Sequence, residues 1–404
     1  MTLPALHSSP RLTAMAAWLR AHPWIPGQVR LIHALGSLSP GVGARLGPFT
    51  FVLDARDRFQ AAMAVERYES RTAGLLARIL RPGDTYLDVG AQLGYTAAQA
   101  ARWIGPQGRM VLFEPDPQAY DRLVRHISSA DPSVAPRIES VPMACSDRVG
   151  QQTFSLCSIL GQSSLELALN PAMSTRQIQV PLTTLDRQVE SKKIGRIRLM
   201  KMDVEGHELW ALRGARDTLG RQGVDYLIVE KALYVLSVLD LEPHHLHGLL
   251  TGWGYVGAHE DGQSVTRDSL MRHEFENLLY ARSADLLVDV FPRLDPTKLN
   301  QGYASGELED YFQQAAAPDL EAIQARRIVR RAAQGNLEAA VCDAAQLLDL
   351  HPSLTHLRGH YAFWLNLLDR KEEALGQYRR IAAEQPDNAE VRQLIKELEI
   401  GDVR

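Results

Sequence analysis

The stretch from Thr85 to Gly105 restricts the fold of this chain more than any other segment. It joins a short apolar run, "TYLDV", to a glycine turn, Gly90–Gly94, and an alanine-rich helical pattern. A strand that passes through a glycine turn into a helix is typical of the first unit of a parallel α/β sheet. Asp88 lies two residues before Gly90, although a carboxylate repels the phosphates that such turns commonly bind. The ligand of this turn must therefore accept a nearby negative charge.

Strand-like and helical patterns alternate after Thr85. Four more β-rich runs follow the first, namely "RMVLFEP", "RIESVPMAC", "RIRLMKMDV" and "DYLIVEKA", and helical segments separate most of them. This alternation predicts βαβ units and a parallel sheet with helices on both faces. The runs "GWGYVGAHE" and "EFENLLYARS" follow close together, so we expect an antiparallel pair at one edge of the sheet.

The N-terminal region, residues 1–70, has mostly helical patterns and a predicted strand pair around "FTFVLDARD". Residues 1–53 contain four arginines and no acidic residue. The simplest interpretation is that accessory helices cover the core of the protein. The alternative is a helix that lies at the interface of an anionic lipid surface, because arginines and apolar side chains together bind such surfaces.

The C-terminal region contains an internal repeat. Residues 71–290 hold the predicted sheet, and "FPRLDPTKLNQGYASG" indicates a linker over 291–318 because it is rich in Pro, Asn and Gly. Within the helical region 319–404, "GNLEAAVCDAAQLLDLHP" and "DRKEEALGQYRRIAAEQP" align at an offset of 34 residues, which resembles the tetratricopeptide repeat. Two units are few, so helices at 319–333 and 388–399 could complete the stack; an ordinary helical bundle is the alternative. Such helices could bind a protein partner or self-associate.

The glycine turn does not fit a nicotinamide dinucleotide. Its spacing is Gly-x-x-x-Gly, whereas the dinucleotide fingerprint is Gly-x-Gly-x-x-Gly. Glu114 ends the next strand, 24 residues after Gly90, where a carboxylate accepts hydrogen bonds from the two hydroxyls of a ribose. Asp88 would attract an ammonium group directly or through water. S-adenosylmethionine has a ribose, an ammonium group and a sulfonium group but no pyrophosphate. We therefore expect it as the cofactor.

Several motifs carry a resemblance to a known family. "LDVGAQLGYT", "FEPDP" and "VPMACSD" are similar to its first three motifs, and "ERYES" to an element ahead of the first strand. The most specific match is "TTLDRQV" with "RLMKMDVEGHELWALRGA". The chain thus resembles the FkbM family of class I, S-adenosylmethionine-dependent methyltransferases over about residues 60–285. Gln92 departs from the pattern, since the family more often has Asn there.

The resemblance implies an α/β fold with the Rossmann-like, seven-stranded sheet of class I methyltransferases, whose last strand is antiparallel. It does not extend to the C-terminal region, for which the helical pattern and the 34-residue offset predict an all-α repeat domain. It also implies methyl transfer to an oxygen, with hydroxyls of sugars or of polyketide-type natural products as acceptors. The cofactor would contact Asp88, Gly90, Gln92, Gly94, Glu114, Ser146, Asp147 and Asp203. The acceptor would contact Tyr68, Glu69 and Glu230.

A dense polar cluster, "DVEGHE", follows the strand "RIRLMKM". Ligands collect at the carboxyl ends of such strands, and methyl transfer to a hydroxyl needs a base within hydrogen-bond reach. We expect Asp203 beside the methyl group, with Glu205 in the same catalytic cluster, and His207 as the base. The alternative for His207 is a solvent-exposed residue in the first turn of a helix. In that case Glu208 would only interact favourably with the positive end of the helix dipole. Asp203 and Glu205 could also hold Mg²⁺, but their spacing is unspecific and no metal is expected.

Two further motifs have simpler interpretations. His244 and His247 are three residues apart in "EPHHLHGLL", as metal ligands on one helix face can be, but no third ligand is apparent. A surface helix over the sheet is therefore favoured for this segment, which also holds His245. Trp253 and Tyr255 are expected in the core or in the wall of an acceptor pocket.

The leading hypothesis is an O-methyltransferase for a glycan or a natural-product small molecule; the alternative is a cofactor-binding scaffold with a helical tail and little turnover. The net charge of −4 disfavours nucleic acid as the substrate, because nucleic-acid binding requires a positive excess. The cysteines, Cys145, Cys157 and Cys342, have no Cys-x-x-Cys spacing, which predicts reduced thiols in a cytoplasmic protein. No apolar run reaches the roughly 18 residues of a membrane span, and interrupting arginines and a histidine argue against a signal peptide.

Overall fold

The fold was analysed in a computed structural model of the chain. The structure describes residues 7–401 except 158–162, 166–173, 234–235, 237–242, 267–268, 272, 274, 300–324, 326–327, 330, 333–335 and 387. The described chain forms two compact units, one of Met1–Leu233 with Leu246–Ala304 and the other of Tyr234–His245 with Ser305–Arg404. No helix among the described residues is long and apolar enough to cross a membrane.

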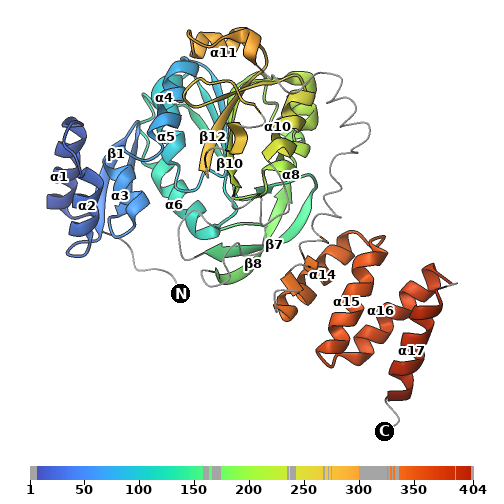
Figure 1. Ribbon diagram of the computed structural model, residues 1–404. Helices are drawn as coiled ribbons and strands as arrows, with labels where there is room; N and C mark the ends of the chain where they lie inside the picture. The colour runs from blue at the N-terminus through green and yellow to red at the C-terminus, as the bar shows by residue number, and fades with distance from the viewer. Residues whose placement is uncertain are drawn as a thin grey trace. The chain divides into compact units, whose positions relative to one another are not determined.

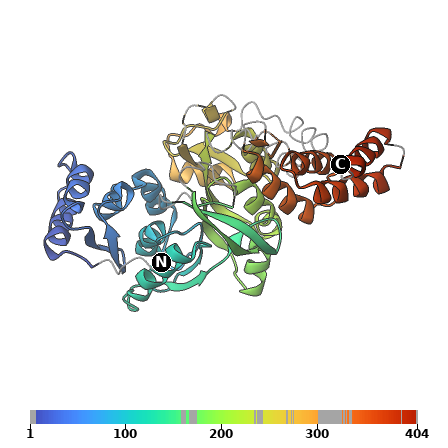
Figure 2. The ribbon, with the colours of Figure 1, turned by 90° about the horizontal axis from the view of Figure 1, so that it is seen from below.

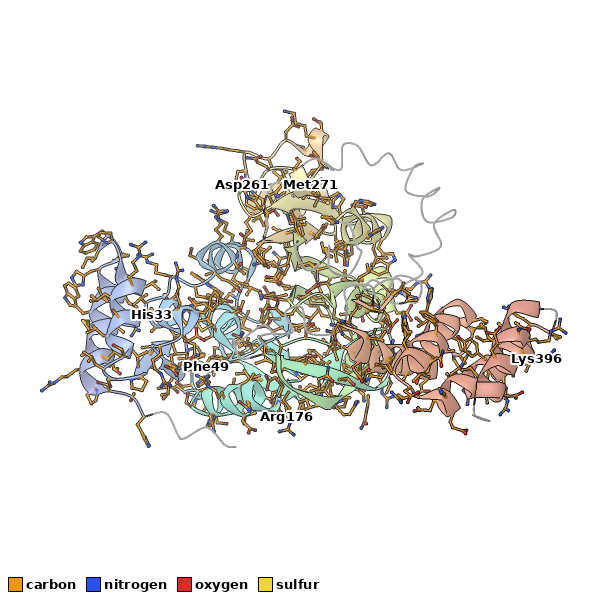
Figure 3. The ribbon with its side chains drawn as sticks, turned by 60° about the horizontal axis from the view of Figure 1, so that its bottom comes forward. His33, Phe49, Arg176, Asp261, Met271 and Lys396 are labelled. Atoms are coloured by element: carbon orange, nitrogen blue, oxygen red, sulfur yellow. The ribbon has the colours of Figure 1, made fainter. Side chains whose placement is uncertain are left out.

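The first unit begins with two helices, a hairpin and two more helices: α1 (Pro10–Ala21), α2 (Gln28–Gly36), β1 (Gly41–Leu46), β2 (Phe49–Asp54), α3 (Arg58–Ala64) and α4 (Ser70–Ile79). Ser9 and Asp57 cap α1 and α3, because their side chains accept hydrogen bonds from backbone N–H groups of the first turn. The strands β1 and β2 pair antiparallel, which confirms the predicted strand pair. Phe49, labelled in Figure 3, is fully buried on β2.

The central sheet has seven strands in the order β11-β12-β10-β9-β3-β4-β5. Its strands are β3 (Thr85–Val89), β4 (Arg109–Phe113), β5 (Arg137–Val141), β9 (Ile197–Met202), β10 (Val224–Ala232), β11 (Val256–His259) and β12 (Phe275–Ala281). The strands from β10 to β5 pair parallel, whereas β12 runs antiparallel to both β10 and β11. This is the predicted class I methyltransferase sheet with an antiparallel last strand, and β11 with β12 is the predicted pair at its edge.

Helices cover both faces of this sheet, as the alternating pattern predicted. They are α5 (Tyr95–Ile104), α6 (Pro117–Ser128), α8 (Glu208–Arg213), α10 (Pro243–Gly252) and α11 (Ala284–Val290). Figure 1 shows α5 and α10 on opposite sides of the strands. This follows from right-handed crossovers, because the chain moves outward from β3 in one direction through β4 and β5 and in the other through β9 and β10. Because helices cover both faces, the central strands are rich in buried apolar side chains, and the charged residues among them, such as Asp88 and Lys201, are exceptions.

A small second sheet was not predicted. It has the order β6-β8-β7 and consists of β6 (Ala144–Cys145), β7 (Gly150–Cys157) and β8 (Ser174–Thr183). Figure 2 brings β7 and β8 forward. The run "RIESVPMAC", expected to form one strand, is therefore divided between two sheets, since β5 ends at Val141 and β6 begins at Ala144. Pro142 lies at this break, where it cannot donate to a strand ladder.

The second unit is helical in its described part, as expected for the C-terminal region. It contains α14 (Leu337–Leu350), α15 (Thr355–Leu367), α16 (Lys371–Glu384) and α17 (Ala389–Gly401). Ala340 on α14 and Ala374 on α16, which match in the 34-residue alignment, are both fully buried in the same apolar cluster. The tetratricopeptide assignment stays a prediction. Most of the predicted helix at 319–333 and most of the predicted linker lie outside the described residues.

Candidate functional site

A cavity of about 670 Å³ lies at the carboxyl ends of four neighbouring strands of the central sheet. Val89 of β3, Phe113 of β4, Asp203 after β9 and Glu230 of β10 all line it. Tyr68 and Glu69, which directly precede α4, form part of the opposite wall. The site thus lies where ligands bind in open parallel sheets, at the point where the strand order reverses.

The glycine turn after β3 brings two strand ends into close contact. Gly90 has a φ of 92°, and a Cβ atom on it would lie 1.8 Å from the carbonyl oxygen of Asp203. Only glycine adopts this backbone geometry and leaves that space free. The N–H groups of Gly90 and Ala91 both donate to the carbonyl oxygen of Phe113, which ties the turn to β4 as well. The turn is therefore held rigidly at the cavity wall.

Two backbone N–H groups hold the carboxylate of Glu114 in place. Its Oε2 accepts a hydrogen bond from the N–H of Gln92 at 2.8 Å, and its Oε1 accepts one from the N–H of Asp116 at 2.8 Å. Burial raises the pKa of this carboxyl to about 8, although the two N–H donors oppose the shift. Each carboxylate oxygen has a second lone pair, so an oriented Glu114 can accept two more hydrogen bonds from a ligand.

Asp88 lies beneath the cavity rather than on its wall. Its side chain is buried, at 1% exposure, and neither carboxyl oxygen accepts a hydrogen bond from the described residues. Burial raises its pKa to about 7, and the ammonium of Lys201 opposes this shift. Asp88 does not line the cavity, whereas its neighbours Val89 and Gly90 do. Its interaction with the ammonium of a ligand, directly or through water, stays a prediction.

Lys201 is a functional candidate that the sequence analysis did not identify. It lines the cavity from β9 and is only 3% exposed. Its Nζ lies 2.6 Å from Oδ2 of Asp203 and 3.8 Å from Oε2 of Glu69. Burial lowers the pKa of Lys201, but the neighbouring carboxylates, Asp203 first, outweigh it and hold the pKa well above its ordinary value. The signal was present in the sequence, because a lysine inside a buried strand pattern is rare unless it is paired.

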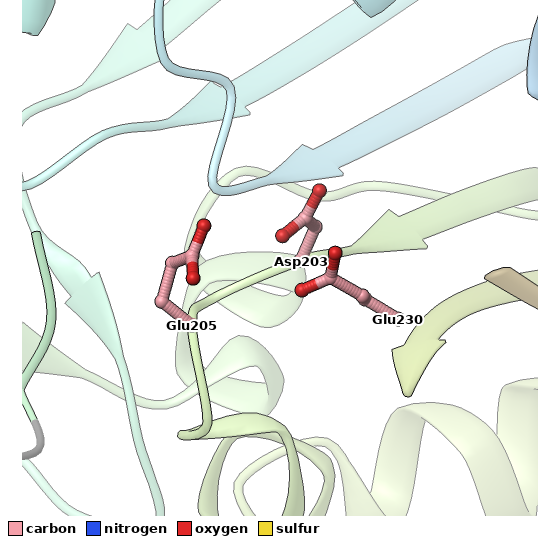
Figure 4. A group of neighbouring side chains, drawn as sticks. All are labelled: Asp203, Glu205 and Glu230. Carbon is pink, nitrogen blue, oxygen red and sulfur yellow. The ribbon is translucent and has the colours of Figure 1, made fainter. Parts of the chain in front are cut away.

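Three carboxylates converge on one side of this lysine. Asp203, Glu205 and Glu230 each offer one oxygen within 4.8 Å of the others, and Figure 4 shows the three side chains directed toward a common space. Burial raises the pKa of Glu205 and of Glu230 well above the usual range, and the charge of Asp203 adds to both shifts. These groups can accept hydrogen bonds from hydroxyls or take up a proton. Acidic groups of this kind are common without a metal, so the cluster by itself does not identify a metal site.

Strained backbone occurs at this cavity. Six described residues other than glycine have a positive φ, and three of them, Glu69, Gln92 and Glu205, line the cavity with φ values of 42°, 52° and 53°. Side chains other than glycine adopt this conformation at a cost of about 1–3 kcal/mol, and such residues cluster at active sites and ligand clamps. The strain supports a functional interpretation of the cavity.

The alternative interpretation of His207, a solvent-exposed residue in the first turn of a helix, is wrong. The side chain is buried, and its Nε2 lies 2.9 Å from Oγ of Ser146. The ring stacks on Trp210, with centroids 5.0 Å apart and planes 9° from parallel. His207 lines the cavity, but its position is fixed by partners on the far side of the wall.

The structure brings most of the predicted site residues to one cavity. The cavity wall includes Tyr68, Glu69, Gly90, Gln92, Glu114, Asp203, Glu205, His207 and Glu230. Three other predicted cofactor residues lie outside the wall, namely Gly94, Ser146 and Asp147. Gly94 is the N-cap of α5, and Asp147 pairs with Arg148 and Arg213. Their predicted contacts with the cofactor are not supported by this geometry.

Other predicted groups belong to the core. Nδ1 of His247 lies 3.1 Å from the hydroxyl of Tyr280, and the hydroxyl of Tyr255 donates to the carbonyl of Val224. Both side chains are buried, so Tyr255 is a core residue and His247 lies on the inner face of α10. The expectation of a surface helix is therefore wrong for His247.

Polar residues from distant segments complete the outer part of the cavity. Thr72, Glu260 and Asn277 line it, and they are joined by hydrogen bonds from Thr72 Oγ1 to Glu260 and from Asn277 Nδ2 to Thr72. Thr72 is separated in the chain by 188 residues from Glu260 and by 205 from Asn277, so no local pattern could have linked it to them.

The central part of the chain matches a known family model. Residues 88–256 match the model of the methyltransferase FkbM domain, which confirms the resemblance drawn from the motifs. The hexuronic acid methyltransferase AglP of Haloferax volcanii is 28% identical over 164 residues, which are 41% of this chain and 62% of that protein. The match thus spans less than two thirds of the relative.

Solved structures with some likeness include an O-methyltransferase from Bacillus cereus with bound SAH. It is 14% identical, with 67% of this chain and 97% of that chain covered and a TM-score of 0.31. A fibrillarin from Aeropyrum pernix with bound S-adenosyl-L-methionine is 16% identical, with 52% and 74% covered and a TM-score of 0.30. Likenesses this low have no bearing on the reaction of this chain.

Proposed function

We propose that this chain, whose residues 88–256 match the methyltransferase FkbM domain, transfers a methyl group from S-adenosylmethionine to a hydroxyl of a sugar, a glycan or a natural-product small molecule. The cofactor supplies a methyl group on a positively charged sulfur. The residues of this chain bind and orient the two reactants and accept the proton of the acceptor hydroxyl.

The position of Glu114 carries the proposal. Two backbone N–H groups fix its carboxylate at the end of β4, 2.8 Å from each donor, beside the turn at Gly90. An oriented carboxylate at this place accepts hydrogen bonds from the two ribose hydroxyls of a nucleoside. The buried charge of Asp88 behind the same turn favours a cationic ligand over a phosphate, since like charges repel at short range.

The acceptor end of the cavity is acidic. Asp203, Glu205, Glu230 and Glu69 surround a single buried ammonium, that of Lys201. Carboxylates accept hydrogen bonds from hydroxyl groups but repel another carboxylate. A neutral polyhydroxyl acceptor therefore suits this site better than a carboxylated one.

Proton removal from the acceptor is assigned to the carboxylate cluster. A hydroxyl has a high pKa, so its deprotonation during methyl transfer needs an acceptor whose own pKa is raised. Glu230 and Glu205 have this property, and Asp203 is held beside them by Lys201. Nε2 of His207 is engaged by Ser146 at 2.9 Å, so the carboxylates are the preferred bases.

The test uses purified protein, methyl-labelled S-adenosylmethionine and two matched sets of acceptors, hexose glycosides and the corresponding hexuronic acids. We expect label in an ether of the neutral sugar and little transfer to the hexuronic acid. The relative AglP is named for hexuronic acid, so the pair of acceptors separates the two specificities. Binding of the cofactor without transfer to any hydroxyl compound would contradict the proposal and favour the scaffold hypothesis.

A further inference from the structure

The N-terminal helices expose large apolar side chains. Trp24, in the turn between α1 and α2, is 73% exposed, and Trp18 on α1 is 53% exposed. On and just after α2, Leu31 and Leu38 are exposed as well. Single exposed apolar residues are ordinary, but several on one short segment usually mark a binding surface.

These helices do not need their outer residues for packing within the unit. The inner side of α1 is already buried through Leu12, Ala16 and Leu19. The outer side carries Ala14, Ala17, Trp18 and Ala21, all exposed and all apolar. A helix at the surface of a water-soluble protein normally places polar residues on its outer side, whereas α1 carries apolar residues on both sides and only Arg11 as an exposed charge.

The aromatic residues form one continuous patch with basic neighbours. The ring of His22 stacks on Trp18, with centroids 4.3 Å apart, and meets Trp24 edge-on at 5.0 Å. Trp24 also lines a shallow cleft with Arg30 and His33, and Figure 3 labels His33 on these helices. We call Trp18, His22, Trp24, Arg30 and His33 the tryptophan patch.

The segment that carries the patch is positively charged and has no acidic residue in its own sequence. Residues 1–53 contain Arg11, Arg20, Arg30 and Arg45 and no Asp or Glu. Arg20 turns inward and donates to the carbonyl of Ala64, whereas Arg11 and Arg30 are exposed. Exposed cations next to exposed tryptophans complement a surface that is both anionic and apolar.

The patch adjoins the cavity proposed to bind the acceptor. Arg67 lines the cleft that contains Trp24, and it also lines the cavity at the carboxyl end of the sheet. Its Nη2 donates to the carbonyl of Pro23, which ties the turn carrying Trp24 to the cavity rim. A surface bound at the patch would therefore lie next to the mouth of the cavity.

We propose that the tryptophan patch docks this protein on an anionic lipid bilayer. Tryptophan prefers the interface between lipid headgroups and acyl chains, and each arginine near an anionic surface strengthens binding. Docking would place the cavity mouth at the membrane surface, where an acceptor attached to a lipid can reach it. The lipid surface accounts for the apolar and the positive features together.

The experiment is co-sedimentation of the full chain with vesicles, without cofactor or acceptor, so that its result does not depend on the proposed reaction. Vesicles of phosphatidylcholine mixed with phosphatidylglycerol are compared with vesicles of phosphatidylcholine alone. We expect binding to the mixed vesicles and a loss of binding at high salt. Trp24→Ser and Trp18→Ser should each weaken binding several-fold, and Arg30→Ser by about fivefold.

Two control variants test whether the effect belongs to the patch. Phe363→Ser removes an apolar side chain that is 50% exposed on α15, and Arg137→Ser removes an arginine whose side chain is 72% exposed at β5. Both should bind like the wild type, and circular dichroism should show that every variant is folded. Equal binding by wild type and Trp24→Ser, or no binding of the wild type to mixed vesicles, would overturn the proposal. A dimer of the wild type that Trp24→Ser dissociates, without vesicle binding, would assign the patch to self-association instead.

Discussion

The ammonium Nζ of Lys201 lies 2.6 Å from Oδ2 of Asp203, and both groups are at the carboxyl end of β9. The pair places a fixed positive charge in the middle of the acidic end of the cavity. Lys201 lowers the pKa of four carboxyls that burial raises, namely Glu69, Asp88, Glu205 and Glu230. Lys201 therefore opposes the effect of burial on all four carboxyls, although their pKa values stay raised.

Replacement of Lys201 should change both stability and the pH dependence of activity. Lys201→Met leaves the partly buried Asp203 without its partner, which costs about 3 kcal/mol of unfolding free energy. The remaining carboxyls lose the cation that lowers their pKa values, so the pH profile of methyl transfer should move to higher pH. Lys201→Arg should restore part of both effects. Lys193→Met, at an exposed position, is the matched control, and an unchanged profile in Lys201→Met would show that the lysine is only structural.

Glu114→Ala should weaken cofactor binding without unfolding the protein. The loss of two charge-assisted hydrogen bonds to the ribose is worth about 3 kcal/mol, which is roughly a hundredfold in Kd. Calorimetry with S-adenosylmethionine and with its demethylated product measures the change. Glu190→Ala, at an exposed position of α7 (Leu185–Ser191), should bind normally. Equal affinity of wild type and Glu114→Ala would remove Glu114 from the site.

Cofactor affinity should depend on pH near neutrality. Burial raises the pKa of Asp88 from 3.8 to about 7 and that of Glu114 from 4.5 to about 8. The ionised carboxylates are the forms that attract an ammonium and accept ribose hydroxyls, so affinity should rise as pH increases through 7 to 8. The sign is opposite for the stability of the free protein. A carboxyl whose pKa is higher in the folded than in the unfolded protein stabilises the fold when it is protonated. This contribution to stability is lost as pH rises from the pKa in the unfolded state to the pKa in the folded state.

Calorimetry across this pH range tests the expected rise in cofactor affinity. Thermal unfolding tests the expected loss of stability of the free protein. Affinity that is constant with pH would mean that neither carboxyl changes its protonation state on binding. Glu114→Gln, which cannot ionise, should lose most of the pH dependence that Glu114 contributes.

The acceptor-side residues should affect turnover more than cofactor affinity. Asp203→Asn and Glu230→Gln should each lower methyl transfer by roughly a hundredfold, with nearly constant cofactor Kd. His207→Ala should have a smaller effect if the histidine only positions the wall through Ser146. Lost cofactor binding in Asp203→Asn would move Asp203 to the cofactor side. Activity that requires added Mg²⁺ and disappears with chelator would assign the carboxylate cluster to a metal.

A chain that ends after Leu299 should fold and bind the cofactor. The large apolar core of the first unit is formed, among the described residues, by side chains from Leu12 to Leu299, and the second unit has its own cluster. We therefore propose that the helical C-terminal region is a separate domain. Calorimetry on the truncated chain is the test, and insolubility or lost binding would show that the C-terminal helices support the catalytic fold.

The sequence alone predicted those structural features that depend on residues close together in the chain. The apolar run before Gly90 and the distance to Glu114 predicted a sheet, a turn and a cofactor, because strand period, glycine geometry and strand ends are local properties. The 34-residue offset likewise predicted helices in the C-terminal region. The burial of His207 and His247 was not predicted, since a short helix can place a histidine toward water or toward the core with the same local pattern.

Only the tertiary structure decided which charges meet. Lys201 and Glu69 are more than 130 positions apart in the chain, and β9 and the start of α4 bring them within 3.8 Å. The same is true of Glu230 beside Asp203 and of Arg67 between the tryptophan patch and the cavity. Electrostatic interactions depend on distance and burial in space, and neither is a property of a sequence motif. The sequence by itself therefore determined the sheet and the place of the cofactor turn, whereas the folded chain decided the charge pattern of the acceptor end.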